Sequence, residues 1–474
     1  MRILFYVLSL SCLALALAYG PSTEAEAEPK KADTSKGLHA YRAARIVTID
    51  GDDVAPGVLV VRDGKVEAVL KADAELPKGA KVVDLGGATI LPGLVNPLTA
   101  IRESSYRGRS SGQASLSSGS PNDLRKIVAL SSVRPEEKVH RRLGRSGYTT
   151  YALAPSSTGR LVAGRASVLR PRKGGETKAS ELALVEKSYM LLGFDLGRTW
   201  YSAAVRYLKG AADGVIKARA AKKKAEEDAK KKAAEAAKKK AEGKPADKKP
   251  TPKPPTPPSR GRARPPAPAK PAAPPKPKAP DPLMELFEGK IPAFLRVRSP
   301  AAMDHLFKFL DSLPLSFKFV LVTGSQSPDV VEKLAKRKDR ILGVILEPRL
   351  ARLSGTTIQV CTARHFIEAG FDVAFVPVFD SLEGFRSIYY YLAAMTQSGL
   401  REREALQAVT TVPAKFLGLE GKVGVLKKGA YANFQVFNQD PLSGTARLLK
   451  VFIEGQEVFS DDPKTGELSG EAVR

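Results

Sequence analysis

The sequence predicts an α/β fold with a separate β module, and two observations support this. Apolar, strand-like runs in the middle of the chain, such as FKFVLVTG and FDVAFVPV, alternate with amphipathic segments such as SPAAMDHLFKFLDSL. Strand followed by helix, repeated, is typical of a parallel sheet. Both ends of the chain hold short alternating runs, such as GVLVVRDGKVEAVL and ANFQVFN, with Gly and Asp turns between them. These runs indicate antiparallel β-structure, and we expect the two ends to form one module.

The first twenty residues are typical of a secretory signal peptide. One positive charge, Arg2, precedes an apolar run, and the small residues Ala16 and Ala18 fit a cleavage site. Two alternatives are a lipoprotein anchor at Cys12 and an uncleaved membrane anchor. Residues 21–37 are small, charged and interrupted by proline, which favours a flexible tether. The sequence therefore predicts an exported protein that is periplasmic, bound to the cell envelope or secreted.

The net charge of +26 is concentrated in one segment, residues 217–280, which holds 21 Lys and Arg against 6 Asp and Glu. We expect a basic, disordered insert rich in Lys, Ala and Pro. Its first part would be a partly helical, solvated rod, and its second part polyproline II. It is either a spacer or an arm for an anionic envelope polymer or a membrane surface. Nucleic acid is not expected, because no aromatic residues are interleaved for base stacking.

The residue types that most often hold metals are scarce. After cleavage of the signal peptide the only cysteine is Cys361, for which a buried structural thiol is expected. No H-x-H pattern occurs, and each of the four histidines is expected to serve packing or to lie at the surface. They are His39, His140, His305 and His365. No metal site and no cofactor are predicted from these residues.

Two stretches resemble the amidohydrolase superfamily. VVDLGGATILPGLVNPLTAIRE is similar to the segment where a β module leads into the first barrel strand through a PG-φ-φ-D-x-H-x-H pattern, and TTVPAKFLGLEGKVGVLKKGAYANFQVFNQDPL is similar to the C-terminal signature. KIPAFLRVRSP and RSGYTTYALAPSSTGRLVAGRASVLRPRKG resemble the imidazolonepropionase-like subgroup. The resemblance implies a TIM-like (β/α) barrel with a composite β-sandwich module. It also implies hydrolysis of non-peptide C–N bonds in cyclic amides or amides, with zinc or another divalent metal.

The same resemblance divides the chain into segments. After the signal peptide and the tether, residues 38–95 form the first part of the β-sandwich module and 96–216 the first part of the barrel. The insert, 217–280, follows. Residues 281–418 complete the barrel, and 419–474 complete the β module.

The metal-binding motifs of the superfamily are degenerate in this chain. Asn96 stands at the first-strand Asp, and Leu98 and Ala100 stand at the two histidines that follow it. Arg296 stands where a further histidine is expected, and Thr323 or its neighbour Gly324 where the next one is. A guanidinium is a permanent cation and repels a metal. The metal site is therefore predicted to be lost.

One catalytic candidate remains, the acid that ends the last barrel strand. Asp380 resembles it, although spacing from Gly370 would put Val378 there, and Asp380 also suits a turn or helix cap.

The sequence predicts a catalytically degenerate, amidohydrolase-like protein. Arg296, Arg165 and Thr323 are candidates to bind a small anionic ligand at the barrel mouth, unless the mouth is plugged. Two other functions stay open. One is a non-catalytic partner in a hetero-oligomer with an active amidohydrolase. The other is an active hydrolase with a relocated metal site held by carboxylates such as Asp380.

Overall fold

The computed structural model of the chain describes residues 37–99, 128–132, 143–155, 161–172, 178–194, 198–241, 282–297, 299–324, 329–353 and 355–461. All of them belong to one unit of the chain, Ser35–Arg474. The predicted signal peptide with Cys12, the tether up to residue 36, Ala100, His140 and insert residues 242–280 lie outside the described residues. No helix in the described ranges is both long and apolar enough to span a membrane.

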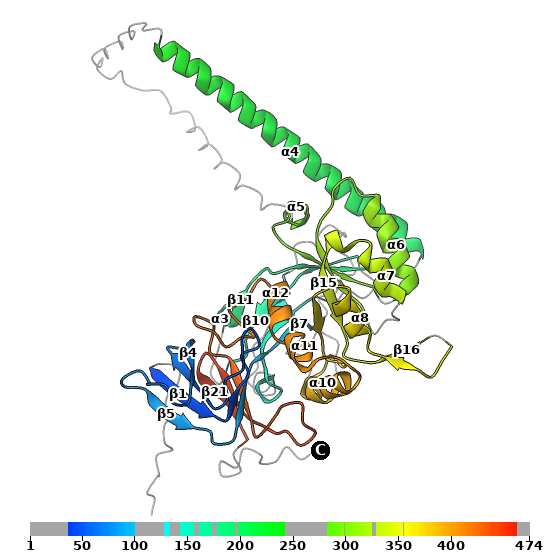
Figure 1. Ribbon diagram of the computed structural model, residues 1–474. Coiled ribbons are helices and arrows are strands. Elements are labelled where there is room, and N and C mark those ends of the chain that lie inside the picture. The colour runs from blue at the N-terminus through cyan, green and yellow to red at the C-terminus, as the bar shows by residue number, and fades with distance from the viewer. Residues whose placement is uncertain are drawn as a thin grey trace, which may run out of the picture. The chain divides into compact units, whose positions relative to one another are not determined.

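Strands from the two chain ends pair with each other (Figure 1). A five-stranded sheet has the order β2-β6-β19-β20-β21, and β6 runs antiparallel to β19 with Pro92 opposite Phe434. A four-stranded sheet has the order β4-β3-β1-β5. The strands are β1 (Leu38–Ala43), β2 (Arg45–Ile46), β3 (Gly57–Arg62), β4 (Lys65–Lys71), β5 (Lys81–Asp84), β6 (Thr89–Pro92), β19 (Phe434–Phe437), β20 (Leu448–Ile453) and β21 (Gln456–Ser460).

One apolar cluster joins these two sheets, because alternate residues of their strands face each other. The ring of Phe434 stacks on that of Phe452 at 4.4 Å between centroids. Tyr41 of β1 meets both rings edge-on, at 5.0 and 5.2 Å. Side chains from both chain ends therefore share one core.

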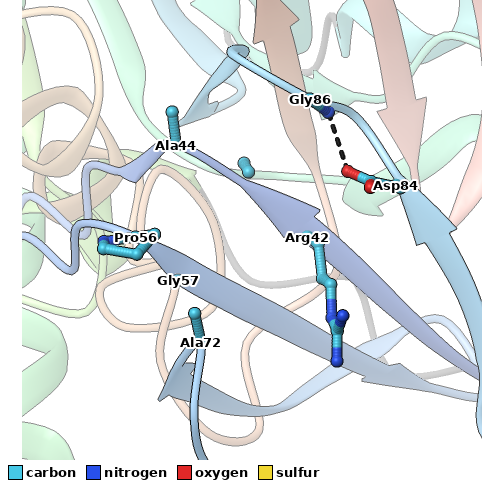
Figure 2. Close-up of a pocket in the computed structure, with 8 residues that line it drawn as sticks. Arg42, Ala44, Pro56, Gly57, Ala72, Asp84 and Gly86 are labelled. Carbon is cyan, nitrogen blue, oxygen red and sulfur yellow. Dashed lines mark hydrogen bonds between the residues drawn. The ribbon is translucent and has the colours of Figure 1, made fainter.

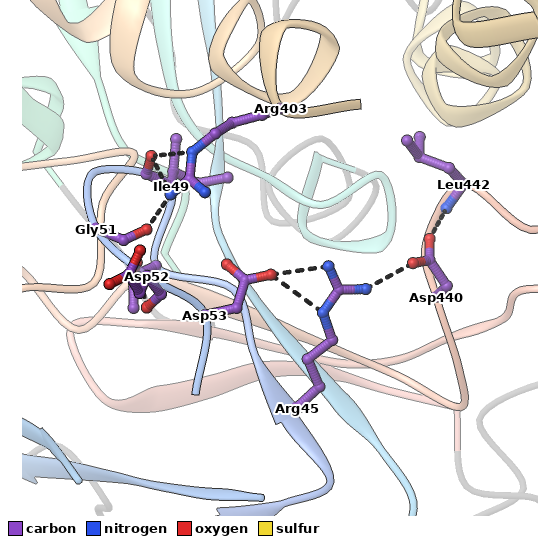
Figure 3. A network of polar contacts seen from close by, with 9 residues as sticks. Arg45, Ile49, Gly51, Asp52, Asp53, Arg403, Asp440 and Leu442 are labelled. Atoms are coloured by element: carbon purple, nitrogen blue, oxygen red, sulfur yellow. Dashed lines mark hydrogen bonds and ion pairs between the residues drawn. The ribbon is translucent and has the colours of Figure 1, made fainter. Parts of the chain in front are cut away.

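A polar network fixes the loop after β2 to the C-terminal half of the chain (Figure 3). The guanidinium of Arg45 lies between the carboxylates of Asp53 and Asp440, each at 2.8 Å. Arg403 donates to the backbone carbonyl of Ile49 at 3.1 Å. Because these groups are partly exposed, each ion pair contributes little free energy, but together they fix the position of the loop.

The middle of the chain forms two further sheets with parallel strands. In one, of order β11-β10-β8-β7, β7 and β8 are parallel. In the other, of order β18-β15-β14-β13-β12-β9, the strands from β12 to β18 are parallel. The strands are β7 (Leu94–Thr99), β8 (Tyr148–Leu153), β9 (Val162–Arg165), β10 (Ser167–Leu169), β11 (Ala183–Val185), β12 (Met190–Gly193), β13 (Ala293–Arg296), β14 (Phe319–Val322), β15 (Ile341–Leu346) and β18 (Val373–Phe375). The predicted α/β class is confirmed.

The two parallel sheets are linked at both edges. Along one edge, β9 and β10 are consecutive, and they pair antiparallel with β12 and β8 respectively. Along the other, the amide of Phe375 in β18 donates to Ala408, at 2.7 Å, while the amide of Val95 in β7 donates to Val409, at 2.9 Å. This arrangement brings the first and last parallel strands, β7 and β18, next to each other.

Helices follow most of the parallel strands, as Figure 1 shows. In α6, Pro300 occupies the first turn, and the Ser299 hydroxyl caps the helix by accepting from the amide of Ala302. The remaining elements are η2 (Ala129–Ser132), α3 (Ala179–Leu182), α4 (Arg198–Ala241), α5 (Pro282–Phe287), α6 (Pro300–Asp311), α7 (Asp329–Ala335), η3 (Lys338–Arg340), a hairpin of β16 (Ala351–Arg352) and β17 (Gln359–Val360), α8 (Thr362–Glu368), α9 (Leu382–Arg386), α10 (Ile388–Gln397), α11 (Glu402–Gln407) and α12 (Thr411–Phe416).

The expected insert boundary at residue 217 does not coincide with the end of an element. Helix α4 runs through it as one helix of 44 residues. The physical reason is that Ala and Lys, which are strong helix formers, occur on both sides of the boundary. Packing changes there instead: Leu208, Ala212 and Val215 are buried, whereas residues 219–234 are exposed.

The parallel strands separate two apolar clusters, because successive side chains point to opposite faces. In β13, Ala293 and Leu295 belong to an outer cluster with the helices, and Phe294 belongs to an inner cluster between the sheets. In that inner cluster the rings of Phe294 and Tyr189 stack at 3.6 Å with planes 5° apart. Aromatic and aliphatic side chains thus fill the space between the sheets.

The PG turn before the first parallel strand has a steric reason. A Cβ on Gly93 would lie 2.2 Å from the hydroxyl oxygen of Thr149, and the amide of Gly93 donates to the carbonyl of Asn433 at 2.9 Å. Only a residue without a side chain allows this close approach of β6, β7 and β8.

We expect His39 to make the protein less stable in mild acid. The imidazole is buried in β1, its Nδ1 has no hydrogen-bond partner, and burial and then Lys81 lower its pKa below the ordinary value of 6.5. The unfolded chain therefore gains a proton below pH 6.5 that the folded chain does not bind, so stability is lost as the pH falls through 6.5. Urea unfolding of the wild type and His39→Gln between pH 8 and pH 5 measures this. A constant difference between the two across that range would contradict it.

Candidate functional site

The C-terminal ends of the parallel strands place several candidate residues along one edge. Arg296 is the last residue of β13 and lies opposite Gly193 of β12 and Val322 of β14. Thr323 follows β14, and its amide donates to Ile345 of β15 at 3.0 Å. Because these strands are parallel, Arg296 and Thr323 lie at the same edge. Ligand sites of α/β folds are found at this edge.

Three polar residues at or after strand ends, Thr99, Arg296 and Asp380, form what we call the strand-end group together with Tyr189, whose side chain extends toward them from the beginning of β12. The Thr99 hydroxyl, at the end of β7, donates to the Asp380 carboxylate at 2.5 Å. The Tyr189 hydroxyl, before β12, donates to the carbonyl of Pro97 at 3.0 Å. The pKa of Tyr189 is raised, and burial is the largest cause. The positive charge of Arg296 lowers this pKa, and the negative charge of Asp380 raises it further. Both charges therefore lie close to a phenol that stays neutral at physiological pH.

Two members of the strand-end group were missed by sequence reasoning. Tyr189 begins the apolar run YMLLG, which signals a buried strand and nothing about a polar role for its first residue. Thr99 is adjacent to Leu98 and Ala100 but matches no position of the family motif. The role of its hydroxyl as a partner of Asp380 can be recognised only once β7 and the segment after β18 are known to lie side by side.

The positions that the family resemblance assigns to metal ligands do not fit a metal ion. Leu98 has no lone pair and packs in the inner cluster. Asn96 is fully buried, and its side-chain oxygen accepts from the amide of Leu98 at 3.1 Å, so it shapes the backbone of β7. Arg296 is cationic, and Thr323 offers a buried hydroxyl without a hydrogen-bond partner. Among the described residues, no three His, Cys, Asp or Glu side chains converge as a metal site requires.

Arg165 does not join the strand-end group, which corrects the sequence-based placement. It lies opposite Met190, at the beginning of β12, whereas Arg296 lies opposite Gly193 at its end. Three residues along a strand separate the two edges by about 10 Å. The buried guanidinium of Arg165 forms an ion pair with Glu285 of α5. The error arises because β9 runs antiparallel to β12, so the end of β9 meets the opposite edge of the sheet.

The three histidines and the one cysteine within the described ranges do not assemble a site. His39 lies in β1, His305 in α6 and His365 in α8. His365 contacts the carbonyl of Cys361 through Nδ1 at 3.2 Å. The Cys361 thiol is buried, and burial raises its pKa, which keeps it protonated and poorly nucleophilic.

A shallow hollow of about 200 Å³ lies in the four-stranded sheet, away from the strand-end group (Figure 2). Arg42 of β1 and Asp84 of β5 line it together with small residues, and Asp84 accepts a hydrogen bond from the amide of Gly86 at 2.9 Å. The Asp84 carboxylate therefore stabilises this turn, and the main polar group that the hollow offers to a ligand is the Arg42 guanidinium.

Residues 360–458 match the model of the Amidohydrolase family. The match covers about a fifth of the chain, from the strand before α8 into β21. It includes the segment after β18 that contains Asp380 and the turn that connects α11 to α12. The C-terminal part of the chain is therefore similar to the Amidohydrolase family over this segment.

Two curated relatives match short stretches. Allantoinase from Streptomyces avermitilis is 46% identical over 55 residues, which is 12% of this chain and 12% of the relative. Amidohydrolase tasK from Hapsidospora irregularis is 42% identical over 65 residues, 14% of this chain and 6% of the relative. The chain thus matches about an eighth or less of the length of either protein.

The fold has a counterpart over nearly its whole length. A solved amidohydrolase from Thermotoga maritima MSB8 superposes with a TM-score of 0.63 at 20% identity, over 89% of this chain and 99% of that one. At this identity the likeness defines the fold. The chain thus shares the α/β fold of that solved structure.

Proposed function

We propose that this chain is an exported, imidazolonepropionase-like member of the amidohydrolase superfamily that has lost metal-dependent hydrolysis. In this proposal the two linked parallel sheets form the barrel, the paired chain ends form its β-sandwich module, and the strand-end group binds a small anionic ligand. One observation carries it: Arg296 ends β13 at the edge where the superfamily binds its metal, and Leu98, the last residue but one of β7, packs in the inner cluster. Export rests on the first twenty residues alone.

The chemistry of these residues opposes the family reaction. A divalent metal lowers the pKa of a bound water and polarises the scissile carbonyl, and it needs neutral imidazoles or carboxylates as ligands. An arginine keeps its proton at any physiological pH, and leucine offers no donor atom. Asp380 is one carboxylate, and it already accepts the hydrogen bond of Thr99. A relocated metal site, the alternative, would have to be built around this one acid.

The same residues suit an anion of low charge. The planar guanidinium of Arg296 can bind a carboxylate through two parallel hydrogen bonds. The Thr323 hydroxyl is buried at the same edge and has no hydrogen-bond partner among the residues that the structure describes, so it can donate to a ligand. The Asp380 carboxylate lies close to the same Tyr189 phenol as Arg296. Its negative charge therefore disfavours a ligand with more than one negative charge. A monocarboxylate therefore fits this group better than a phosphate dianion.

Metal content is the first test of this proposal. We expect elemental analysis of the purified protein to find well under one equivalent of zinc, iron and manganese, before and after incubation with each metal. We also expect no hydrolysis of a panel of cyclic amides and amides. One equivalent of metal together with turnover would overturn the proposal in favour of an active hydrolase with a relocated site.

The ligand is tested separately by thermal unfolding in the presence of small carboxylates. At least one monocarboxylate should raise the unfolding temperature of the wild type, and Arg296→Ala should remove that rise. Arg352→Ala is the matched control, because Arg352 is exposed in the β16–β17 hairpin and should leave the rise unchanged. Absence of a shift with every anion would overturn the binding role. Partnership with an active amidohydrolase stays a prediction, which co-purification with such an enzyme would test.

A further inference from the structure

Helix α4 has two parts with different surroundings. In its first part Leu208, Ala212 and Val215 are buried, and the guanidinium of Arg219 donates to the carbonyl of Phe287 in α5 at 2.9 Å. The side chains of residues 219–234 are exposed without interruption, apart from that one hydrogen bond. One end of the helix is therefore fixed to the folded unit, and residues 220–234 face solvent.

The solvent-facing part carries a regular excess of positive charge. Residues 217–241 include 11 Lys and Arg against 4 Asp and Glu. Lysine triplets recur every eight residues, at 222–224, 230–232 and 238–240. In an α-helix eight residues advance by about 12 Å, and three consecutive residues cover about 200° of the circumference. Lysines thus occur on every side of the helix at a regular axial spacing.

Internal ion pairs leave most of this charge uncompensated. Lys222 and Glu226, one turn apart, approach to 4.0 Å, and both side chains are mostly exposed. Such a pair contributes little, because water and salt screen it. Three acidic residues, at 226–228, lie between the first two triplets, which together hold six lysines.

We propose that residues 217–241 of α4 are a docking surface for a flexible, linear polymer of phosphate groups. Charge complementarity supports this partner: the lysine triplets repeat along the axis as phosphates repeat along a chain, and a flexible chain can follow them around the helix. Binding releases counterions from the polymer, which makes it favourable and strongly dependent on salt. The inference does not depend on the proposed function of the strand-end group.

A membrane surface and a nucleic acid fit this helix less well. A helix that lies on a bilayer has an apolar face that enters the headgroup region, and residues 217–241 have Ala as their only apolar residue type. Single-stranded nucleic acids are held by aromatic side chains that stack on bases, and no Phe, Tyr or Trp occurs between residues 208 and 241. A polymer of phosphates needs neither feature.

The test compares full-length variants that differ in where six lysines are lost. In the first, residues 222–224 and 230–232 are changed from Lys to Gln, which keeps the helix propensity. The control carries the same change at six exposed lysines outside α4: Lys71, Lys78, Lys308, Lys318, Lys336 and Lys428. Binding to inorganic polyphosphate is measured at several salt concentrations, with circular dichroism to confirm folding.

We expect the α4 variant to bind polyphosphate at least tenfold more weakly at 150 mM salt and to show a flatter salt dependence, while the control changes less than threefold. Equal weakening of both variants would show a diffuse charge effect and overturn the proposal. Tighter binding of the wild type to anionic phospholipid vesicles, or to DNA of equal charge, would overturn it in favour of that partner.

Discussion

Replacing Gly424 with alanine is expected to lower the free energy of unfolding by about 3 kcal/mol, the sum of a left-handed backbone penalty and a steric clash. Gly424 has φ of +70°, and a Cβ there would lie 2.4 Å from the backbone carbonyl oxygen of Thr410. That oxygen belongs to the turn before α12, so it cannot move without displacing the helix. Urea unfolding followed by circular dichroism measures the change.

The position of Gly424 explains why the effect should be global. Its neighbour Val423 belongs to the inner cluster between the parallel sheets, and Leu426 belongs to the cluster of the β module. A shift of this segment therefore disturbs two cores at once.

Two glycines nearby serve as controls for Gly424. Gly429 has φ of +87° but open space around a Cβ, so Gly429→Ala should cost about 1 kcal/mol from backbone strain alone. Gly444 has open space and no positive φ, so Gly444→Ala should change stability by about 0.5 kcal/mol or less. A Gly424→Ala variant no less stable than Gly429→Ala would show that the clash with Thr410 is relieved without cost.

The sequence was sufficient for features that depend on local pattern. The strand-helix alternation predicted the α/β class. The exposed part of α4 lacks apolar residues at helical spacing, whereas Leu208, Ala212 and Val215, spaced by four and three, mark the part that packs.

Features that depend on strand direction and on pairing could not be read in this way. Arg165 ends a strand in the sequence as plainly as Arg296 does, yet β9 is antiparallel to β12 and leaves Arg165 at the opposite edge. A hydrophobic pattern has the same period in both directions, so it does not report direction. The hydrogen bond between Thr99 and Asp380 joins residues 281 positions apart, and only the fold brings them together.

Replacing Phe294 with alanine is expected to cost about 3–5 kcal/mol, as is typical for removing a fully buried phenylalanine. Phe294 lies two residues before Arg296, and its ring has no exposed surface and stacks on Tyr189 at 3.6 Å in the inner cluster. Its removal leaves a cavity between the two sheets and takes away the support of the Tyr189 ring. Denaturant unfolding gives the cost, and Phe294→Leu, which keeps most of the volume, should cost about 1.5 kcal/mol or less.

Phe459 provides a matched control, because it lies partly exposed in β21 at the edge of its sheet. Phe459→Ala should lower the free energy of unfolding by about 1 kcal/mol. A partly exposed side chain gains only part of the transfer free energy that full burial provides, so its removal costs less. Equal costs for the two alanine variants would contradict a packed interior beneath the strand ends.

A packed interior limits where a ligand can bind. Because Phe294 and Tyr189 fill the space below Arg296, a ligand of the strand-end group must bind at the edge of the strands and cannot enter between the sheets. Phe294→Leu, if it stays folded, should therefore bind small carboxylates as the wild type does.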